Sequence, residues 1–266
     1  MKKEENILTK IAEKTRERVV EEKRIFPLTE VKRDAEEAAS DRSREVPDFL
    51  AALKKPGLSY ICEVKKASPS KGVIVEDFPY LQIAKEYEEA GASAVSVLTE
   101  PFYFQGEDRF LAEISDEIKI PALRKDFLVD EYMVYKAAAL HASAVLLLCN
   151  ILDDSELKAY RELAESLNMN ALVEAYDEKE LERALDSGAK IVGVNNRNLR
   201  TFKVDTGRSV EFRRKVPSGI VFVSESGVQT ADDIRIMKKA NVDAVLIGET
   251  LMRAPDKKAK LRELDS

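Results

Sequence analysis

Lysine and glutamate side chains lie at the ends of several predicted strands, at spacings suited to acid–base chemistry. Side chains alternate along a strand, so Glu63 and Lys65 share a face with Ile61. The same parity rule, applied to other strands, selects Lys125, Glu174 and Asn195, and Glu225 follows the seventh strand. A single charge just past a strand is usually solvated. A whole set that meets in one cavity is costly unless the charges pair or serve chemistry, so we favour a catalytic role.

Composition limits what this chemistry can be. The 266 residues include one histidine, two cysteines and no tryptophan, while 35% are charged. A Ser-His-Asp triad would have to use His141, and a histidine-rich metal site is excluded. No Walker loop or dinucleotide fingerprint occurs among the ten glycines. The acids and bases of an enzyme with this sequence are therefore lysines and carboxylates.

Charge and hydropathy exclude two classes of partner. The net charge of −6 and the pI near 5.3 give no support for nucleic-acid binding. The longest apolar run, Ala142–Cys149, is far shorter than the ~20 residues that cross a bilayer, so no membrane partner is expected. Cys62 and Cys149 have no C-x-x-C partner, and the N-terminus does not resemble a signal peptide. We therefore expect reduced thiols and a cytoplasmic location.

The elements that must position these residues follow a repeating pattern. Four similar segments start at Gly91, His141, Gly188 and Asn241, which are 50, 47 and 53 residues apart. Each follows a helical pattern and leads into an apolar run. Glycine or asparagine suits the left-handed residue that ends a helix. With the runs between them, eight strands are predicted, at Tyr60–Val64, Val95–Leu98, Ile120–Leu123, Val145–Leu148, Ala171–Val173, Ile191–Val194, Ile220–Val223 and Val245–Ile247.

Helical segments separate the predicted strands. They are expected at about 80–90, 107–117, 131–140, 154–167, 177–187, 206–215 and 229–240, with a further one after Pro255. Strands that alternate with helices form parallel sheets, either a doubly wound sheet or a (β/α)8 barrel. The count of eight and the length of the repeat favour the α/β class and the TIM barrel.

The first 46 residues form a separate, highly charged segment in which 24 residues are charged. Apolar residues at helical spacing predict an amphipathic helix over 4–24, and a second helix is predicted over 28–40. A short helix is expected to start at Pro47. We therefore expect an N-terminal helical extension (1–46) packed on the barrel (47–266).

Two turns and one loop suggest binding of an anion. Backbone N–H groups at Ser226-Gly227 and Gly248-Glu249 follow the last two strands, where barrels commonly hold phosphate. These glycines could instead merely permit tight turns. The polar loop 65–72 reads as a mobile lid carrying Ser68, or as a plain solvated loop.

Histidine and cysteine are not expected to take part in catalysis. His141 occupies the position of Gly91 and Gly188, at the end of the barrel opposite the chemistry. Cys62 has the opposite parity to Glu63 and should face the surrounding helices. Cys149 lies nearer the predicted site, but nothing close to it in sequence would activate the thiol.

Taken together, these motifs resemble the indole-3-glycerol phosphate synthase family of tryptophan biosynthesis. The resemblance runs from about residue 4 to 260. Its most specific part is Cys62-Glu-Val-Lys-Lys-Ala-Ser-Pro-Ser70 followed by Leu123-Arg-Lys-Asp-Phe127. The other motifs, in the family's order, are Leu172-Val-Glu-Ala175, Gly193-Val-Asn-Asn-Arg-Asn-Leu199, Ser224-Glu-Ser-Gly227 and Leu246-Ile-Gly-Glu249.

The resemblance implies a lyase that converts 1-(2-carboxyphenylamino)-1-deoxyribulose 5-phosphate into indole-3-glycerol phosphate, releasing carbon dioxide and water. It implies no metal or organic cofactor. A weakly nucleophilic aromatic carbon must attack a ketone, so a proton donor is needed at the carbonyl oxygen. Lys125 matches the family's general acid, and Glu174 matches the base of the later dehydration. Lys65 matches a lysine that holds anionic groups, with Glu63 orienting it.

The remaining site residues implied by the resemblance bind substrate. Asn195 and Glu225 would fix sugar hydroxyls and the lysine geometry. The predicted substrate and phosphate contacts are Lys65, Ser68, Arg197, Ser226, Gly227, Gly248 and Glu249, and the predicted apolar pocket for the anthranilate ring is Phe104, Phe127, Leu146, Leu148 and Leu199. Glu249 stands where many relatives have serine, and an acidic side chain is unfavourable beside a phosphate. Other enzymes of tryptophan biosynthesis are candidate partners.

Three rival functions are open at this stage. A Schiff-base aldolase would use Lys125 or Lys65 as nucleophile. Phosphoribosylanthranilate isomerase shares the fold, but its reaction typically needs a Cys–Asp pair across the barrel, and Cys62 has the wrong parity. The third is a non-catalytic barrel kept for partner binding, against which the intact set of Lys65, Lys125 and Glu174 argues.

Overall fold

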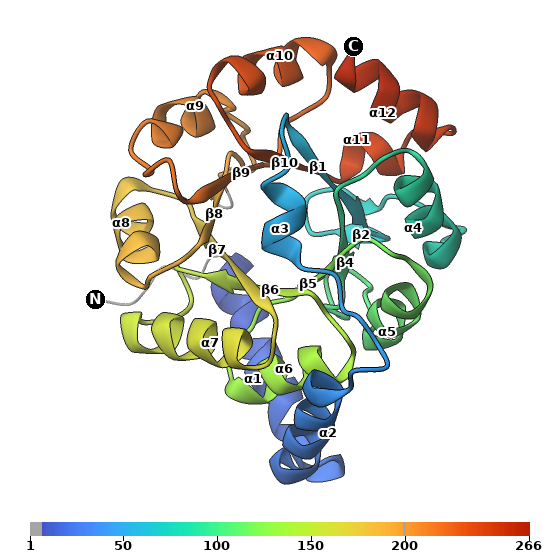
Figure 1. Ribbon diagram of the computed structural model, residues 1–266, viewed down its shortest axis with the longest axis vertical. Coiled ribbons are helices and arrows are strands. Elements are labelled where there is room, and N and C mark those ends of the chain that lie inside the picture. Colours follow the sequence, from blue (N-terminus) through green and yellow to red (C-terminus); the bar gives the residue numbers. More distant parts are fainter. Residues whose placement is uncertain (1–6, 199–200) are drawn as a thin grey trace.

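Parallel strands form the centre of the molecule and close on themselves. The structure, a computed structural model, describes residues 7–198 and 201–266. Within those residues eight parallel strands make a closed barrel surrounded by helices (Figure 1). Around the barrel the strands are β1 (Ser59–Val64), β4 (Ala94–Leu98), β5 (Ala122–Lys125), β6 (Ala144–Leu148), β7 (Asn170–Ala175), β8 (Ile191–Asn195), β9 (Val221–Glu225) and β10 (Ala244–Ile247), which pairs with β1. The predicted TIM barrel is confirmed, and the doubly wound sheet is excluded.

Side chains of the strands alternate between the inside of the barrel and the layer beneath the helices. Ile61, Leu123 and Leu172 belong to the apolar cluster inside the barrel. Cys62 and Val64 belong to the cluster that packs against the helices. The parity rule is therefore confirmed, including the outward orientation of Cys62. One detail was wrong: β5, β7 and β9 each end two residues later than predicted, so Lys125, Glu174 and Glu225 lie within the strands rather than after them.

Helices cover the outside of the barrel. The predicted segments match observed helices within two residues at each end, namely α4 (Tyr80–Glu89), α5 (Asp108–Glu117), α6 (Glu131–Ala139), α7 (Asp154–Ser166), α8 (Glu178–Asp186), α9 (Gly207–Arg213), α10 (Ala231–Lys239) and α12 (Lys257–Asp265). A short α11 (Glu249–Met252) follows β10. Before their strands, Gly91, His141, Gly188 and Asn241 all have positive φ. The repeated motif is thus the left-handed end of each helix.

Three helices that precede the first strand reach both ends of the barrel. They are α1 (Ile7–Ile25) and α2 (Leu28–Ser40) of the N-terminal segment, and α3 (Phe49–Leu53), which follows it. Phe49 and Leu53 of α3 join the interior cluster, and Leu50 N donates to Asn170 Oδ1 (2.8 Å) at the start of β7. Leu8 of α1 joins the same interior cluster at its other end, while α2 packs on α6 (Figure 1). Helix α3 therefore covers the amino ends of the strands, and α1 covers their carboxyl ends.

Two local details differ from the sequence prediction. Helix α3 begins at Phe49 rather than Pro47, because the side chain of Asp48 caps it by accepting a hydrogen bond from Ala51 N. The loop after β1 is not fully irregular. It contains a small antiparallel hairpin, β2 (Ala67–Ser68) with β3 (Gly72–Val73). Separately, among the described residues no helix combines the length and apolar character needed to cross a membrane.

Candidate active site

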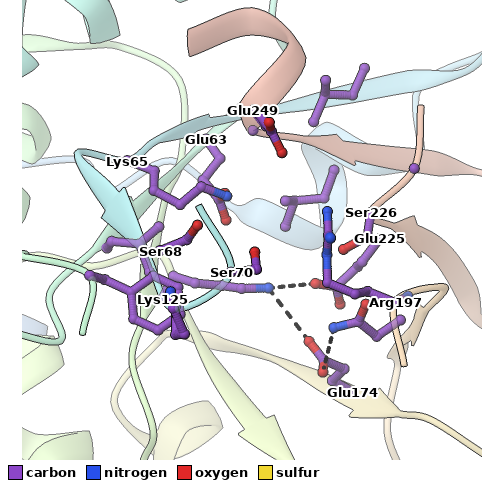
Figure 2. A pocket seen from close by; sticks show the side chains of 18 of the residues that line it. Glu63, Lys65, Ser68, Ser70, Lys125, Glu174, Arg197, Glu225, Ser226 and Glu249 are labelled. Carbon is purple, nitrogen blue, oxygen red and sulfur yellow. Dashed lines mark hydrogen bonds and ion pairs between the residues drawn. The ribbon is translucent and has the colours of Figure 1, made fainter. Parts of the chain in front are cut away.

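A cavity of about 480 Å³ opens at the carboxyl ends of the barrel strands. This is the end where barrels of this class carry their active sites. All six residues predicted at the strand ends line it, and the close-up shows Lys125 pointing toward the two carboxylates Glu174 and Glu225 (Figure 2). The structure thus brings the predicted set together in one place, from β1, β5, β7, β8 and β9. In the fully described chain segments, no cluster of three or more potential metal ligands occurs.

Lys125 lies between two carboxylates. Its Nζ is 2.5 Å from Glu225 Oε2 and 3.6 Å from Glu174 Oε2. Burial alone would lower the pKa of Lys125, but the charges of Glu225, Glu174 and Glu63 raise it above the ordinary lysine value. The amine therefore remains protonated at neutral pH. That is the state that a general acid requires, whereas a Schiff-base nucleophile requires the neutral amine.

Glu174 is oriented by an amide whose direction is fixed. Asn195 Oδ1 accepts from Arg197 N (3.0 Å), so the amide nitrogen of Asn195 must face the other way. That nitrogen donates to Glu174 Oε1 (3.1 Å). Burial and the nearby charge of Glu174 raise the pKa of Glu225, although Lys125 acts against this. The two glutamates therefore have different hydrogen-bond partners: Asn195 donates to Glu174, and Lys125 donates to Glu225.

Glu63 and Lys65 form a second ion pair, at the end of β1. Burial would raise the pKa of Glu63, but Lys65 and Lys125 lower it, so the carboxylate is charged. A Cβ at Gly248 would overlap Glu63 Oε1 and would lie 2.8 Å from Lys65 Nζ. Glycine at the end of β10 thus leaves the room in which this ion pair lies.

Gly193 has the same relation to Glu225. A Cβ there would overlap Glu225 Oε1, and the carboxylate would have to move off Lys125. We expect Gly193→Ala to fold but to lower kcat by roughly a hundredfold, because misplacing a catalytic group by about 1 Å costs about that much. Circular dichroism and steady-state kinetics would measure both. Gly219→Ala is the control, since a Cβ there meets nothing within 4 Å; equal kinetics in the two variants would contradict the steric argument.

The residues of the two predicted phosphate turns also line the cavity. Ser226 and Gly227 both have positive φ (66° and 100°), and a Cβ on Gly227 would lie 2.6 Å from Val204 Cγ1. Gly248 precedes the first residue of α11. All of Ser226, Gly227, Gly248 and Glu249 line the cavity, as does Arg197. The turns therefore expose main chain to the cavity, as an anion site requires.

The side chain of Glu249 has cationic partners that the sequence prediction missed. Arg253 Nε donates to Glu249 Oε1 (3.1 Å), and Lys71 Nζ is 3.4 Å from the same oxygen. These cations lower the pKa of Glu249, although its partial burial works in the opposite direction. The negative charge of Glu249 is therefore partly balanced by two cations beside the phosphate turns. The i, i+4 spacing of Glu249 and Arg253 on one helical stretch was the available sequence signal.

Apolar side chains form the remaining wall of the cavity. Four of the five predicted pocket residues, Phe104, Phe127, Leu146 and Leu148, line it, and the fifth, Leu199, lies outside the described residues. The rings of Phe104 and Phe127 are 6.1 Å apart. Ile7, Leu8 and Ile11 of α1 also line the cavity, which the sequence did not reveal. Their helical spacing indicated a buried face but not the surface that it covers.

The loop after β1 lies over the cavity and is tied to its apolar wall. Ser68 lines the cavity as predicted, and so do Pro69 and Ser70. Ala67 N donates to Phe104 O (3.3 Å). The segment that carries Phe104 is shaped in turn by the buried carboxylate of Glu100, which accepts from the backbone N–H groups of residues 102, 103 and 104.

The residues predicted to take no part in catalysis lie outside the cavity lining. Burial raises the pKa of the Cys149 thiol to about 12 and also raises that of Cys62. Neither cysteine lines the cavity. His141 lies beside a different hollow, together with Arg44 and Asp116, at the amino end of the barrel. Among the described residues, therefore, no cysteine or histidine lines the main cavity to act as nucleophile or base.

Solved structures resemble this chain in fold at low sequence identity. The 3-hexulose-6-phosphate synthase of Salmonella typhimurium aligns with a TM-score of 0.65 at 12% identity, covering 78% of this chain and 96% of that one. A KGPDC from Streptococcus mutans aligns with a TM-score of 0.61 at 13% identity, covering 78% and 95%. At these identities the likeness concerns the fold alone.

Sequence comparisons are far more specific. The family model described as indole-3-glycerol phosphate synthase matches residues 8–264. The indole-3-glycerol phosphate synthase of Ruminiclostridium cellulolyticum is 49% identical over 97% of this chain and 98% of its own length. That of Lacticaseibacillus casei is 57% identical over 80% and 82% of the two chains, and that of Endomicrobium trichonymphae is 50% identical over 97% and 99%. This chain belongs to the indole-3-glycerol phosphate synthase family, a family of decarboxylating lyases.

Proposed function

We propose that the cavity closes the pyrrole ring of 1-(2-carboxyphenylamino)-1-deoxyribulose 5-phosphate, with Lys125 as general acid. The observation that carries this assignment is the position of Lys125 in the cavity, held by Glu225 at 2.5 Å and Glu174 at 3.6 Å. When the aromatic carbon attacks the ketone, the carbonyl oxygen gains negative charge. A protonated amine beside it can supply the proton at that moment.

Glu174 serves the last step in this proposal. Ring closure followed by loss of carbon dioxide leaves a hydroxyl on the new ring, and its departure as water requires removal of a ring proton. Glu174, oriented by the amide of Asn195, acts as the base. Glu225 keeps Lys125 in place through its ion pair, and Asn195 and Glu225 also contact the sugar hydroxyls.

The two ends of the substrate bind on opposite sides of Lys125. Its phosphate lies at the main-chain turns of Ser226-Gly227 and Gly248-Glu249, with Arg197 beside them. Lys65, oriented by Glu63, holds anionic groups of the substrate and acts as a second acid, with Ser68 of the covering loop nearby. The anthranilate ring lies against the apolar wall formed by Phe104, Phe127, Leu146 and Leu148.

A fluorescence assay tests the activity directly. Indole-3-glycerol phosphate contains an indole ring that the substrate lacks, so indole fluorescence should rise after the carboxyphenylamino-deoxyribulose phosphate is added. Release of one carbon dioxide per indole should accompany it. The absence of turnover would overturn the proposal and support the non-catalytic barrel. Borohydride trapping of a covalent lysine adduct with a ketose phosphate would support the aldolase instead.

The cellular setting is a further part of the proposal. We place the protein in the cytoplasm, among other enzymes of tryptophan biosynthesis that supply its substrate and use its product. The two free, buried cysteines support a reducing compartment. We also propose that the extension (1–46) and the barrel (47–266) act as a single domain, which is supported by the residues of α1 that line the cavity.

A further inference from the structure

Arg18 of α1 reaches the strand that carries Lys125. Its Nη2 donates to Asp126 Oδ2 (2.9 Å), across 108 positions of sequence. The Arg18 side chain is 11% exposed and that of Asp126 is 0% exposed. An exposed ion pair contributes little to structure, but a buried one with two well-placed partners fixes the groups that it joins. Helix α1 is therefore joined to the end of β5 by a buried charge pair.

Asp126 is satisfied within the barrel even without Arg18. Its Oδ2 also accepts from Thr99 Oγ1 (2.8 Å) and lies 3.4 Å from Arg124 Nη2, while its Oδ1 accepts from Phe127 N (2.8 Å). Arg124 is buried as well, with Thr99 Oγ1 at 3.2 Å from its Nε. Removing Arg18 would thus leave Asp126 with a cation and a hydroxyl, so the barrel should tolerate the loss.

The outer half of α1 is fixed by further pairs. Glu22 accepts from Lys136 Nζ of α6 (2.9 Å), and Lys23 Nζ is 2.8 Å from Asp130 at the start of α6. These contacts lie beyond Arg18, toward the C-terminal end of the helix. None of them holds the other half of α1, which carries the side chains that line the cavity.

Arg18 lies between this outer anchor and the cavity wall. Ile11 is seven residues before Arg18, a rise of roughly 10 Å along the helix. Leu8 and Ile11 are buried in the interior cluster with Phe127 and Leu148. Their position over the apolar wall therefore depends on the angle at which α1 leaves the barrel. Arg18 makes a buried polar contact with the barrel that helps to set this angle.

We propose that Arg18 is a positioning residue for substrate binding: its ion pair with Asp126 holds α1 as a wall of the apolar pocket. The proposal rests on the function assigned to the cavity above. It predicts a specific kinetic consequence. Loosening α1 weakens contact with the aromatic ring of the substrate while leaving Lys125 and its two carboxylates in place, so KM rises and kcat changes little.

Arg18→Met tests this proposal, because methionine keeps the apolar stem and removes the charge. We expect KM to rise roughly tenfold, the size typical of losing one hydrogen bond to a charged group, with kcat within about threefold. Arg18→Lys should recover part of the loss. Hydrogen–deuterium exchange should quicken in α1 and not in β5. Arg24→Met is the matched control, since Arg24 is 69% exposed on the same helix and pairs only with Glu21 among the described contacts.

Two results would overturn the proposal. One is an unchanged KM in Arg18→Met together with unchanged exchange in α1. The other is quicker exchange throughout the barrel, which would mean a general role in stability. Failure of the proposed function would look different, since wild type and Arg24→Met would then both lack turnover while the exchange measurement would still report how α1 is held.

Discussion

Lys125→Ala is expected to lower kcat by about a thousandfold, within the range that general acid catalysis contributes. No other cation is seen within ion-pair distance of both Glu174 and Glu225 in the described part of the chain. Without Lys125, the ketone oxygen of the substrate has no adjacent proton donor when the ring closes. Steady-state measurement of indole fluorescence would give the change in kcat.

The same variant should still bind substrate. The truncation removes no atom of the phosphate turns or of the apolar wall, so their contacts with the substrate remain. The buried carboxylates that face each other without a cation can take up a proton, since burial already raises the pKa of Glu225. Titration calorimetry should therefore give a dissociation constant within about tenfold of the wild-type value. The contacts that remain are those that bind the substrate equally well before and during the reaction.

Lys190→Ala is the matched control for this experiment. Lys190 precedes β8 at the opposite end of the barrel, is 58% exposed and pairs with Glu165 (3.2 Å). Its loss should leave kcat unchanged. Turnover of Lys125→Ala within a few-fold of the wild type would contradict the general-acid assignment and would direct attention to Lys65.

The parity of strand residues was enough to find the acid–base group. Lys125 and Glu174 point into the cavity because Leu123 and Leu172, two positions earlier, are interior core residues. The same rule correctly predicted that Cys62 faces the surrounding helices and not the cavity. Alternation along a strand is a local property of the backbone, and closure of the barrel then brings the ends of all eight strands to one place. For that reason local sequence could predict a site built from five separate strands.

Contacts between distant segments could not be predicted in the same way. The apolar face of α1 was visible in the sequence, but nothing in its spacing identifies Phe127 and Leu148 as its partners. The pairing of Arg18 with Asp126 joins residues 108 positions apart and depends on the angle between a helix and the barrel. Such choices are made by tertiary packing, for which periodicity within one segment carries no information.

Side-chain partners at the phosphate turns illustrate the same limit. The sequence showed an acidic Glu249 where an anion should bind, and its charge appeared unfavourable. In the structure Lys71, from the hairpin after β1, and Arg253 offset that charge. The pairing with Arg253 could have been predicted from the i, i+4 spacing of the two residues. Lys71 was not, since its approach depends on how the loop after β1 folds over the barrel.

Glu174→Gln is expected to separate the last step of the reaction from the first. Glutamine keeps an oxygen that can accept from Asn195 Nδ2, so the side chain should stay in place while its basicity is lost. Ring closure depends on Lys125 and should slow by less than about tenfold. Dehydration, which needs the base, should slow by about a hundredfold or more, as general base catalysis typically contributes.

Single-turnover kinetics can resolve these steps, because carbon dioxide leaves before the indole ring is complete. With substrate labelled at the carboxyl carbon, Glu174→Gln should release label in an early phase, and indole fluorescence should follow in a much slower one. In the wild type the two signals should nearly coincide. Glu178→Gln, an exposed residue at the start of α8 that pairs with Lys215, is the control and should behave as wild type. If label release and fluorescence slow equally in Glu174→Gln, the base for dehydration is a different group, and Glu225, the other carboxylate held against Lys125, becomes the residue to test.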